Sequence, residues 1–110
     1  HFAKMDLEGH ELAALRGWDQ HLKAHKIRAL YLEVIPENQA RYDLPTNAAL
    51  RFLEERGYRL FLCKEQDFGL FGESPSALES LGGTIPAAHF HAGDYPEDHA
   101  TDALALASGA

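Results

Sequence analysis

Hydrophobic and polar residues follow one another in blocks, and the first blocks predict strands and helices in turn. Residues 2–6 are a short apolar segment that ends in a carboxylate, which predicts a strand. Residues 12–26 carry leucines near helical spacing, which predicts a helix that Gly17 interrupts. The nearly continuous apolar run 27–35 ends at Pro36 and is typical of a strand covered on both faces.

The next blocks repeat this order and add a hairpin. A polar connection over residues 38–44 leads to a second helix, for which Thr46 is a suitable N-cap and Gly57 a stop. Residues 58–64 alternate and are rich in aromatic side chains, which predicts a strand, and residues 68–71 are its expected antiparallel partner. Strands that alternate with helices predict an α/β fold.

The pattern weakens after residue 72. Residues 75–81 favour one further helical stretch, and from residue 84 onward there is no clear period. The alanine-rich residues 100–110 are expected to form a frayed helix or a disordered tail.

Composition narrows the class of protein. A chain of 110 residues with 45% hydrophobic and 25% charged residues predicts one soluble globular domain at most. Its net charge of −7 argues against a nucleic acid or an anionic membrane as the main partner. No apolar run approaches the roughly 18 residues of a membrane span. The single cysteine, Cys63, excludes an internal disulfide and fits the reducing cytoplasm.

The candidate chemistry begins where the first predicted strand ends. Asp6 and Glu8 come at this end, just before a glycine turn and a helix. In an open α/β sheet, ligands bind beyond the carboxyl ends of the strands. There the two carboxylates can orient an acceptor, accept a proton or bind a divalent metal. They can equally cap the helix that follows, and both interpretations stay open.

Glu33 is the charged residue of the second predicted strand. A carboxylate inside an apolar run is costly unless it is paired or near the open end of the strand. We expect Glu33 to lie near that end, adjacent to Asp6 across the sheet, where neighbouring carboxylates raise one another's pKa, which suits a general base or a metal site. The alternative is a hydrogen bond from the loop after its own strand.

The C-terminal region carries several side chains that bind metals. His89 and His91 alternate as zinc ligands sometimes do, with Asp94 or His99 as a third ligand. Glycine and proline interrupt any scaffold for such a site, so a polar tail is favoured and no metal site is predicted.

Residues 4–17, KMDLEGHELAALRG, resemble the K-[IM]-D-x-E-G-x-E-x-x-x-L-x-G stretch of FkbM-type methyltransferases, which use S-adenosylmethionine to methylate hydroxyl groups. The resemblance extends over about residues 1–72. It implies the C-terminal half of a Rossmann-like class I methyltransferase sheet, with six strands parallel and one reversed. Residues 2–6 and 28–35 would be its fourth and fifth strands, and residues 58–64 and 68–71 its sixth strand and reversed seventh. Residues 73–110 would be a helical or disordered C-terminal extension.

The resemblance also implies a function. The expected reaction is O-methylation of a small molecule or sugar, with Asp6, Glu8 and Glu33 on the acceptor side of the site. The glycine-rich loop and the acidic residue that hold the cofactor in this family match no residue of the chain, so we expect the isolated chain to be inactive without an N-terminal half. We expect no nucleic-acid or membrane partner, and self-association through the exposed first strand. A non-enzymatic α/β interaction fragment, with the same carboxylates as helix caps, is the alternative.

Overall fold

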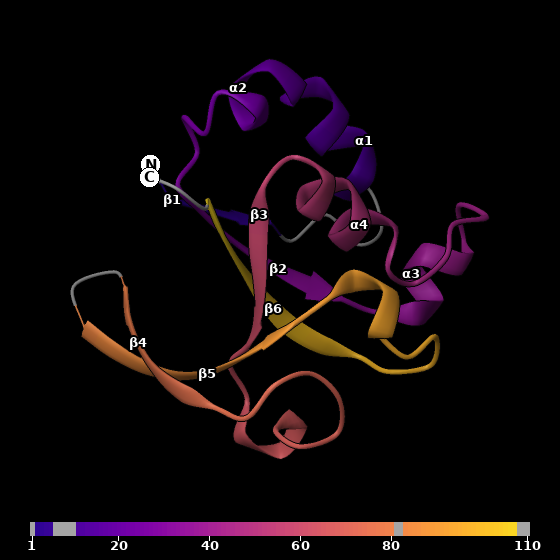
Figure 1. Cartoon of the computed structure of the whole chain (residues 1–110). Coiled ribbons are helices and arrows are strands. Elements are labelled where there is room, and N and C mark those ends of the chain that lie inside the picture. Colours follow the sequence, from indigo (N-terminus) through magenta and orange to yellow (C-terminus); the bar gives the residue numbers. More distant parts are fainter. Residues whose placement is uncertain (1, 6–10, 81–82, 108–110) are drawn as a thin grey trace.

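The computed structural model describes residues 2–5, 11–80 and 83–107, which form an α/β fold (Figure 1). Within these residues, six strands form a sheet in the order β1-β2-β6-β3-β5-β4. The strands are β1 (Phe2–Met5), β2 (Ala29–Val34), β3 (Tyr58–Leu62), β4 (Ser76–Ser80), β5 (Gly83–Phe90) and β6 (Thr101–Ala107). The α-helices are α1 (Glu11–Gly17), α2 (Asp19–Lys23), α3 (Pro36–Ala40) and α4 (Ala48–Glu55), with 3-10 turns η1 (Glu65–Asp67) and η2 (Ala92–Asp94). No helix in this described part is long and apolar enough to cross a membrane.

The sheet is mostly antiparallel, which corrects the predicted parallel sheet. β1 and β2 are parallel, with Phe2 opposite Ala29 and Met5 opposite Leu32. β6 lies between β2 and β3 and runs antiparallel to both. Beyond β3, β5 and β4 are each antiparallel to the strand before them. Four strands, β1, β2, β3 and β4, therefore point in one direction, and β5 and β6 are reversed, with β6 between β2 and β3.

The predictions for the first 62 residues are largely confirmed. The two strands and the helix broken at Gly17 are present, and Gly57 follows α4 with a φ of 86°, a conformation that favours glycine. Thr46 is not the N-cap of α4, because Asn47 occupies that position. The Thr46 hydroxyl instead donates to the backbone oxygen of Glu97 at 2.5 Å. The polar connection also contains the short helix α3, which was not predicted.

The predictions for the later residues are mostly wrong. Residues 68–71 form turns rather than a strand, and residues 76–80, predicted as helical, form β4. Residues 101–107, predicted as frayed helix or disorder, form β6 in the middle of the sheet. Strands from both sides of position 72 therefore share one sheet.

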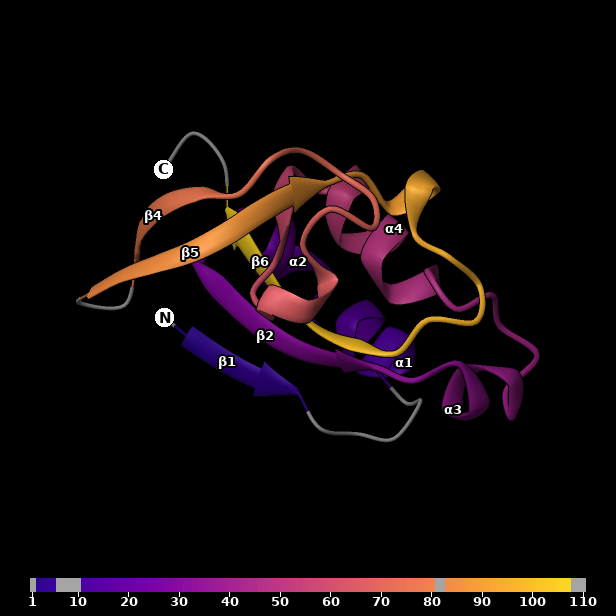
Figure 2. The same cartoon turned by 90° about the horizontal axis from the view of Figure 1, so that it is seen from below.

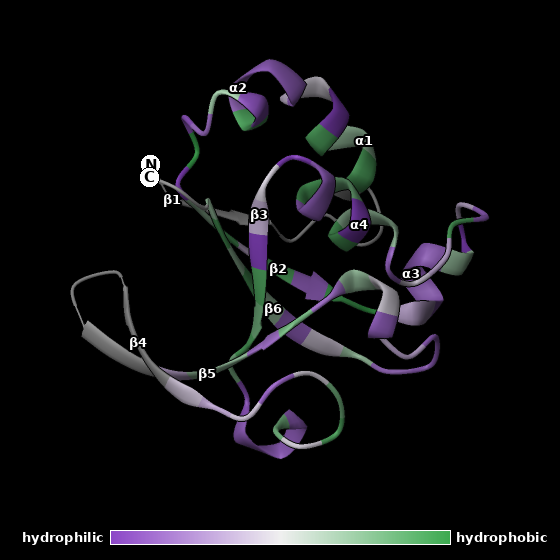
Figure 3. Ribbon diagram, viewed as in Figure 1, coloured by the Kyte–Doolittle hydropathy of each residue, from purple (hydrophilic) through white to green (hydrophobic). Residues whose placement is uncertain are grey.

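The helices α1, α2 and α4 cover one face of the sheet and form the main core with it, while α3 lies beyond the end of β2 (Figure 2). Hydrophobic residues run along β3 and β6 and on the helices that pack above them (Figure 3). This core contains Leu15, Leu22, Leu30, Leu32, Val34, Ala49, Leu50, Leu53, Tyr58, Leu60, Leu62, Ala88, Phe90, Ala92, Tyr95, Ala103 and Ala105. The opposite face carries a small cluster of Ala29, Phe61, Ala87 and Leu104. Since Glu33 is exposed and Tyr31 is half-buried, β2 is not covered on both faces as predicted.

Candidate functional site

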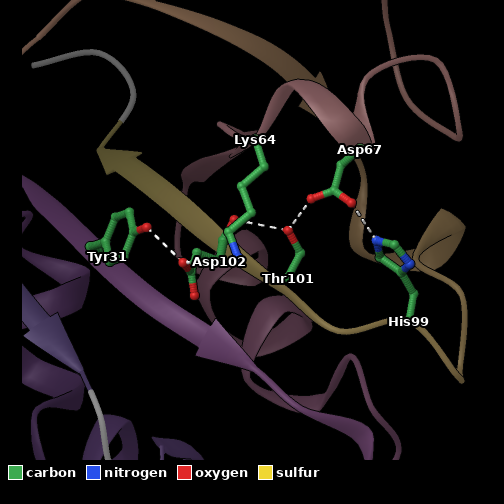
Figure 4. Close-up of polar contacts among 6 residues, drawn as sticks. All are labelled: Tyr31, Lys64, Asp67, His99, Thr101 and Asp102. Atoms are coloured by element: carbon green, nitrogen blue, oxygen red, sulfur yellow. Dashed lines mark hydrogen bonds and ion pairs between the residues drawn. The ribbon is translucent and has the colours of Figure 1, made fainter.

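Polar side chains gather at one edge of the sheet, where β2 and β3 end and β6 begins. The register sets Val34 of β2 opposite Thr101, and Leu62 of β3 opposite Ala103. The carboxyl ends of the two co-directional strands therefore meet at the start of β6. Figure 4 shows the polar residues gathered around this start, and two linked groups of contacts can be followed there.

The first group surrounds Asp102 of β6. The Tyr31 hydroxyl donates a 2.8 Å hydrogen bond to Oδ2 of Asp102, and Nζ of Lys64 lies 3.4 Å from the same oxygen (Figure 4). Burial, followed by the hydrogen bond to Asp102, raises the pKa of Tyr31 to about 12. Tyr31 is therefore a hydrogen-bond donor at neutral pH and not a base.

Glu33 lies directly beside this group. It is the Cα partner of Asp102 across the β2–β6 pair, and its side chain is exposed. Because side chains alternate along a strand, Glu33 and Tyr31 point to the same face of the sheet. Two carboxylates, a phenol and an ammonium group thus lie together at the strand ends.

The second group centres on Asp67 of η1, which is 2% exposed. One carboxylate oxygen accepts a hydrogen bond from the Thr101 hydroxyl, and the other lies 2.8 Å from Nε2 of His99 (Figure 4). The Tyr95 hydroxyl in turn donates to the backbone oxygen of His99 at 2.6 Å, and burial raises the pKa of Tyr95. A buried carboxylate with these partners fixes η1 against the start of β6. This group supports the edge and is less accessible than the first.

The predicted site residues are found only in part. Asp6 and Glu8 lie outside the described residues. Met5, the last residue of β1, pairs with Leu32, so Glu33 is the next residue of β2 past that pair. The prediction that Glu33 lies near the carboxyl end of its strand is confirmed.

Sequence reasoning assigned no role to several residues at this edge, namely Tyr31, Lys64, Asp67, Thr101 and Asp102. One signal was available for Tyr31, since it comes two residues before Glu33 on a strand and must share its face. Asp102 offered no such signal, because its neighbours on β2 and β3 are about 70 and 40 positions away in the sequence, across strand pairings that alternation alone does not predict.

The edge is suited to a molecule that carries hydroxyl groups. A hydroxyl donates one hydrogen bond and accepts up to two. Glu33 and Asp102 offer acceptors, Lys64 offers donors, and the Tyr31 oxygen, whose own proton is donated to Asp102, offers one more acceptor. Donors and acceptors side by side therefore match the needs of one or more hydroxyls.

Comparison with known proteins identifies the family of the chain. The family model described as the methyltransferase FkbM domain matches residues 1–60, a segment that includes β1, α1, α2, β2, α3 and α4 and reaches into β3. This match places the protein among the methyltransferases. The chain belongs to the FkbM methyltransferase family. No match was found among curated proteins or among solved structures.

Proposed function

We propose that this chain forms the acceptor side of an S-adenosylmethionine-dependent O-methyltransferase that acts on a hydroxyl of a small molecule or sugar. The observation that carries the proposal is the strand-end edge with Glu33 and Asp102, within a chain of the FkbM family. The direction of the strands supports it in part. β1, β2 and β3 are co-directional and the reversed strand β6 lies between β2 and β3, while β5 is a second reversed strand where the Rossmann-like class I sheet implies one.

The proposed roles follow from the chemistry of the transfer. The acceptor oxygen must lie in line with the methyl group, and a base takes its proton. Asp6 and Glu8 follow β1 in the sequence, and Glu33 lies near the end of the neighbouring strand. In our proposal these three carboxylates orient the acceptor and accept its proton. Asp102, held by Tyr31, hydrogen-bonds a neighbouring hydroxyl.

The residues of this chain do not fit the cofactor itself. When bound, S-adenosylmethionine supplies an electrophilic methyl group. Its binding in this family uses a glycine-rich loop and an acidic residue at a strand end. No segment of the sequence matches that loop, since its one glycine pair, Gly82-Gly83, stands alone. We therefore assign no residue of this sequence to cofactor binding.

Methyl transfer by the product of the complete reading frame tests the function. We expect labelled methyl groups to pass from S-adenosylmethionine to members of a panel of sugars and small alcohols. Glu33→Gln and Asp6→Asn are expected to lower kcat by about 10²–10⁴-fold, as for loss of a general base. Glu55→Gln, which changes an exposed glutamate of α4, is the matched control and should retain the activity.

Two outcomes would contradict the proposal at different points. If no hydroxyl acceptor in the panel receives a methyl group, the proposed reaction is contradicted. Full activity of Glu33→Gln would remove the role of this residue alone. A calorimetric titration of the isolated chain with S-adenosylmethionine tests the assignment of the cofactor, and micromolar binding would contradict it.

Self-association is a separate proposal. β1 is one of the two edge strands of the sheet, and among the described residues only β2 pairs with it. An unpaired strand edge favours pairing with a second copy. We expect the isolated chain to elute as a dimer or larger species in size-exclusion chromatography, and a stable monomer at all concentrations would contradict this.

A further inference from the structure

A second polar cluster lies outside the strand-end edge and has no part in the proposed function. It consists of Glu73, His89 and His91. Each residue offers one ligand atom, and these atoms lie within 4.8 Å of one another. Glu73 comes from the loop after η1, His89 from β5, and His91 from the residue after β5. Two segments of backbone, the loop after η1 and the end of β5, thus bring together two imidazoles and a carboxylate.

The backbone holds two of these residues in place. The amide of Glu73 donates a 2.7 Å hydrogen bond to the carbonyl oxygen of His89. Gly72 has a φ of +83°, and a Cβ there would lie 2.7 Å from this same oxygen and 2.9 Å from Cβ of Phe90. Only glycine allows the loop to approach β5 so closely. The pairing of His89 with Phe61 of β3 fixes the other side.

The side chains already contact one another. Nδ1 of His89 is hydrogen-bonded to Oε2 of Glu73. The two imidazole rings are 4.9 Å apart between centroids, in an edge-to-face arrangement. His89 also packs on the Phe61 ring, at 5.5 Å between centroids, which limits the rotation of its side chain. The ligand atoms are therefore close together without a large rearrangement.

Glu54 of α4 orients the third residue. Its Oε2 lies 3.0 Å from Nδ1 of His91, and its Oε1 accepts a 3.3 Å hydrogen bond from the amide of Ala92. A carboxylate on one ring nitrogen fixes the tautomer and leaves the other nitrogen, here Nε2, as a ligand. Metal-binding histidines are commonly oriented in this way.

We propose that Glu73, His89 and His91 bind one zinc ion, with Glu54 as a positioning residue for His91. Two imidazoles and one carboxylate are a known ligand set for zinc, with water in the remaining position. The exposure of Glu73 and His91 leaves room for that water. The bound ion ties the loop after η1 to β5 and, through Glu54, to α4.

Calorimetric titration of the untagged chain with Zn²⁺ tests the proposal. We expect one ion per chain and a rise of Tm on binding, since a metal that binds the folded state stabilises it. Glu73→Gln and His91→Ala are each expected to weaken binding by at least about 10-fold, and Glu54→Gln by about 10-fold, as for partners of metal-bound histidines. His21→Ala, which changes an exposed histidine of α2, should bind as tightly as the unchanged protein.

Co²⁺ provides an independent readout, because its visible absorption reports the type and number of ligands. We expect a cobalt spectrum that Zn²⁺ abolishes and that the Glu73→Gln/His91→Ala double variant lacks. Circular dichroism without metal checks that each variant is folded, which is expected because both side chains are largely exposed. Binding that is equal in the folded double variant, or absent in the unchanged protein, would overturn the proposal. Either result leaves the proposed methyl transfer untouched.

Discussion

The two faces of the central sheet differ in kind, although the same strands supply both. On one face, Leu30, Leu32 and Val34 of β2 pack against helices in a core that includes seventeen buried residues. On the other face, Tyr31 and Glu33 of the same strand lie beside Asp102, and only four buried residues form the apolar cluster. These numbers refer to the described part of the chain.

The helix-covered face supplies most of the stability of the fold, and the open face carries the charged groups of the candidate site. Burial of apolar surface stabilises a fold by about 25 cal/mol per Å², and most of that surface belongs to the helix-covered face. The open face is free to carry charged groups at the strand ends because little of the core depends on it. Successive side chains of β2 and β6 point to opposite faces of the sheet, so the same two strands supply both the apolar face and the polar one. Substitutions of neighbouring residues should therefore have very different effects.

The largest expected effect separates Leu32 from Glu33. Leu32 is fully buried in the helix-side core, so Leu32→Ala should lower the free energy of unfolding by about 2–5 kcal/mol. Glu33→Gln changes an exposed side chain and should stay within about 0.5 kcal/mol. Urea denaturation of both variants measures the two values. Similar losses for both would show that the open face is also part of the core.

A smaller loss of stability is expected at the strand-end edge, where β2 and β3 end and β6 begins. Asp67 is buried and accepts hydrogen bonds from Thr101 and His99. Asp67→Ala removes both acceptors and should destabilise the protein by about 1–3 kcal/mol, because the Thr101 hydroxyl is left buried without this partner. Asp102→Ala is the comparison on the open face, where water can replace the lost carboxylate. A loss for Asp102→Ala equal to that of Asp67→Ala would contradict this distinction.

The helix-covered face was partly predictable from the sequence. The leucines of residues 12–22 and the apolar run of residues 27–35 have the periodicities of a helix and a buried strand, and both elements are present. Gly57 ends α4 as expected, because its positive φ favours glycine. These signals are local, so one sequence is enough to detect them.

The later strands were not predictable in the same way. Alanine has the highest intrinsic helix propensity, and the alanine-rich residues 101–107 were therefore predicted to be part of a frayed helix or a disordered tail. In the structure, Ala103 and Ala105 lie under the helices, where small side chains are needed, while Leu104 and Leu106 point to the other face. Their alternation with a period of two was the missed signal. Tertiary packing outweighed propensity here.

The candidate site was predictable only where it lies within one segment. Glu33 stood out as a charge within an apolar strand. Asp102 and Lys64 contact each other because β6 enters between β2 and β3, and this topology is not encoded in any short motif. The contact of Glu73 with His89 joins the loop after η1 to β5, and no short motif encodes it either, so Asp94 and His99 were considered in place of Glu73.

The smallest expected effect tests whether the open face is in fact polar and partly buried at Tyr31. The pKa of Tyr31, about 12, is above its ordinary value of 10.0 through burial first and the Asp102 hydrogen bond second. The folded state therefore holds the phenolic proton more tightly than the unfolded state. The stability that this contributes is fully present below pH 10.0 and is lost as the pH rises toward 12.

Asp102→Asn should lower the pKa of Tyr31 from about 12 while leaving it above 10.0, because the acceptor charge is removed and the burial remains. The measurement is the alkaline absorbance titration of tyrosinate, taken as the difference between each protein and its Tyr31→Phe variant. Lys64→Gln is the matched control. It removes the ammonium group beside Oδ2 of Asp102 and leaves the hydrogen bond from Tyr31 to that oxygen in place. If Tyr31 titrates at 10.0 in the unchanged protein, the contact with Asp102 is open to water, and the two faces differ less at this edge than their burial indicates.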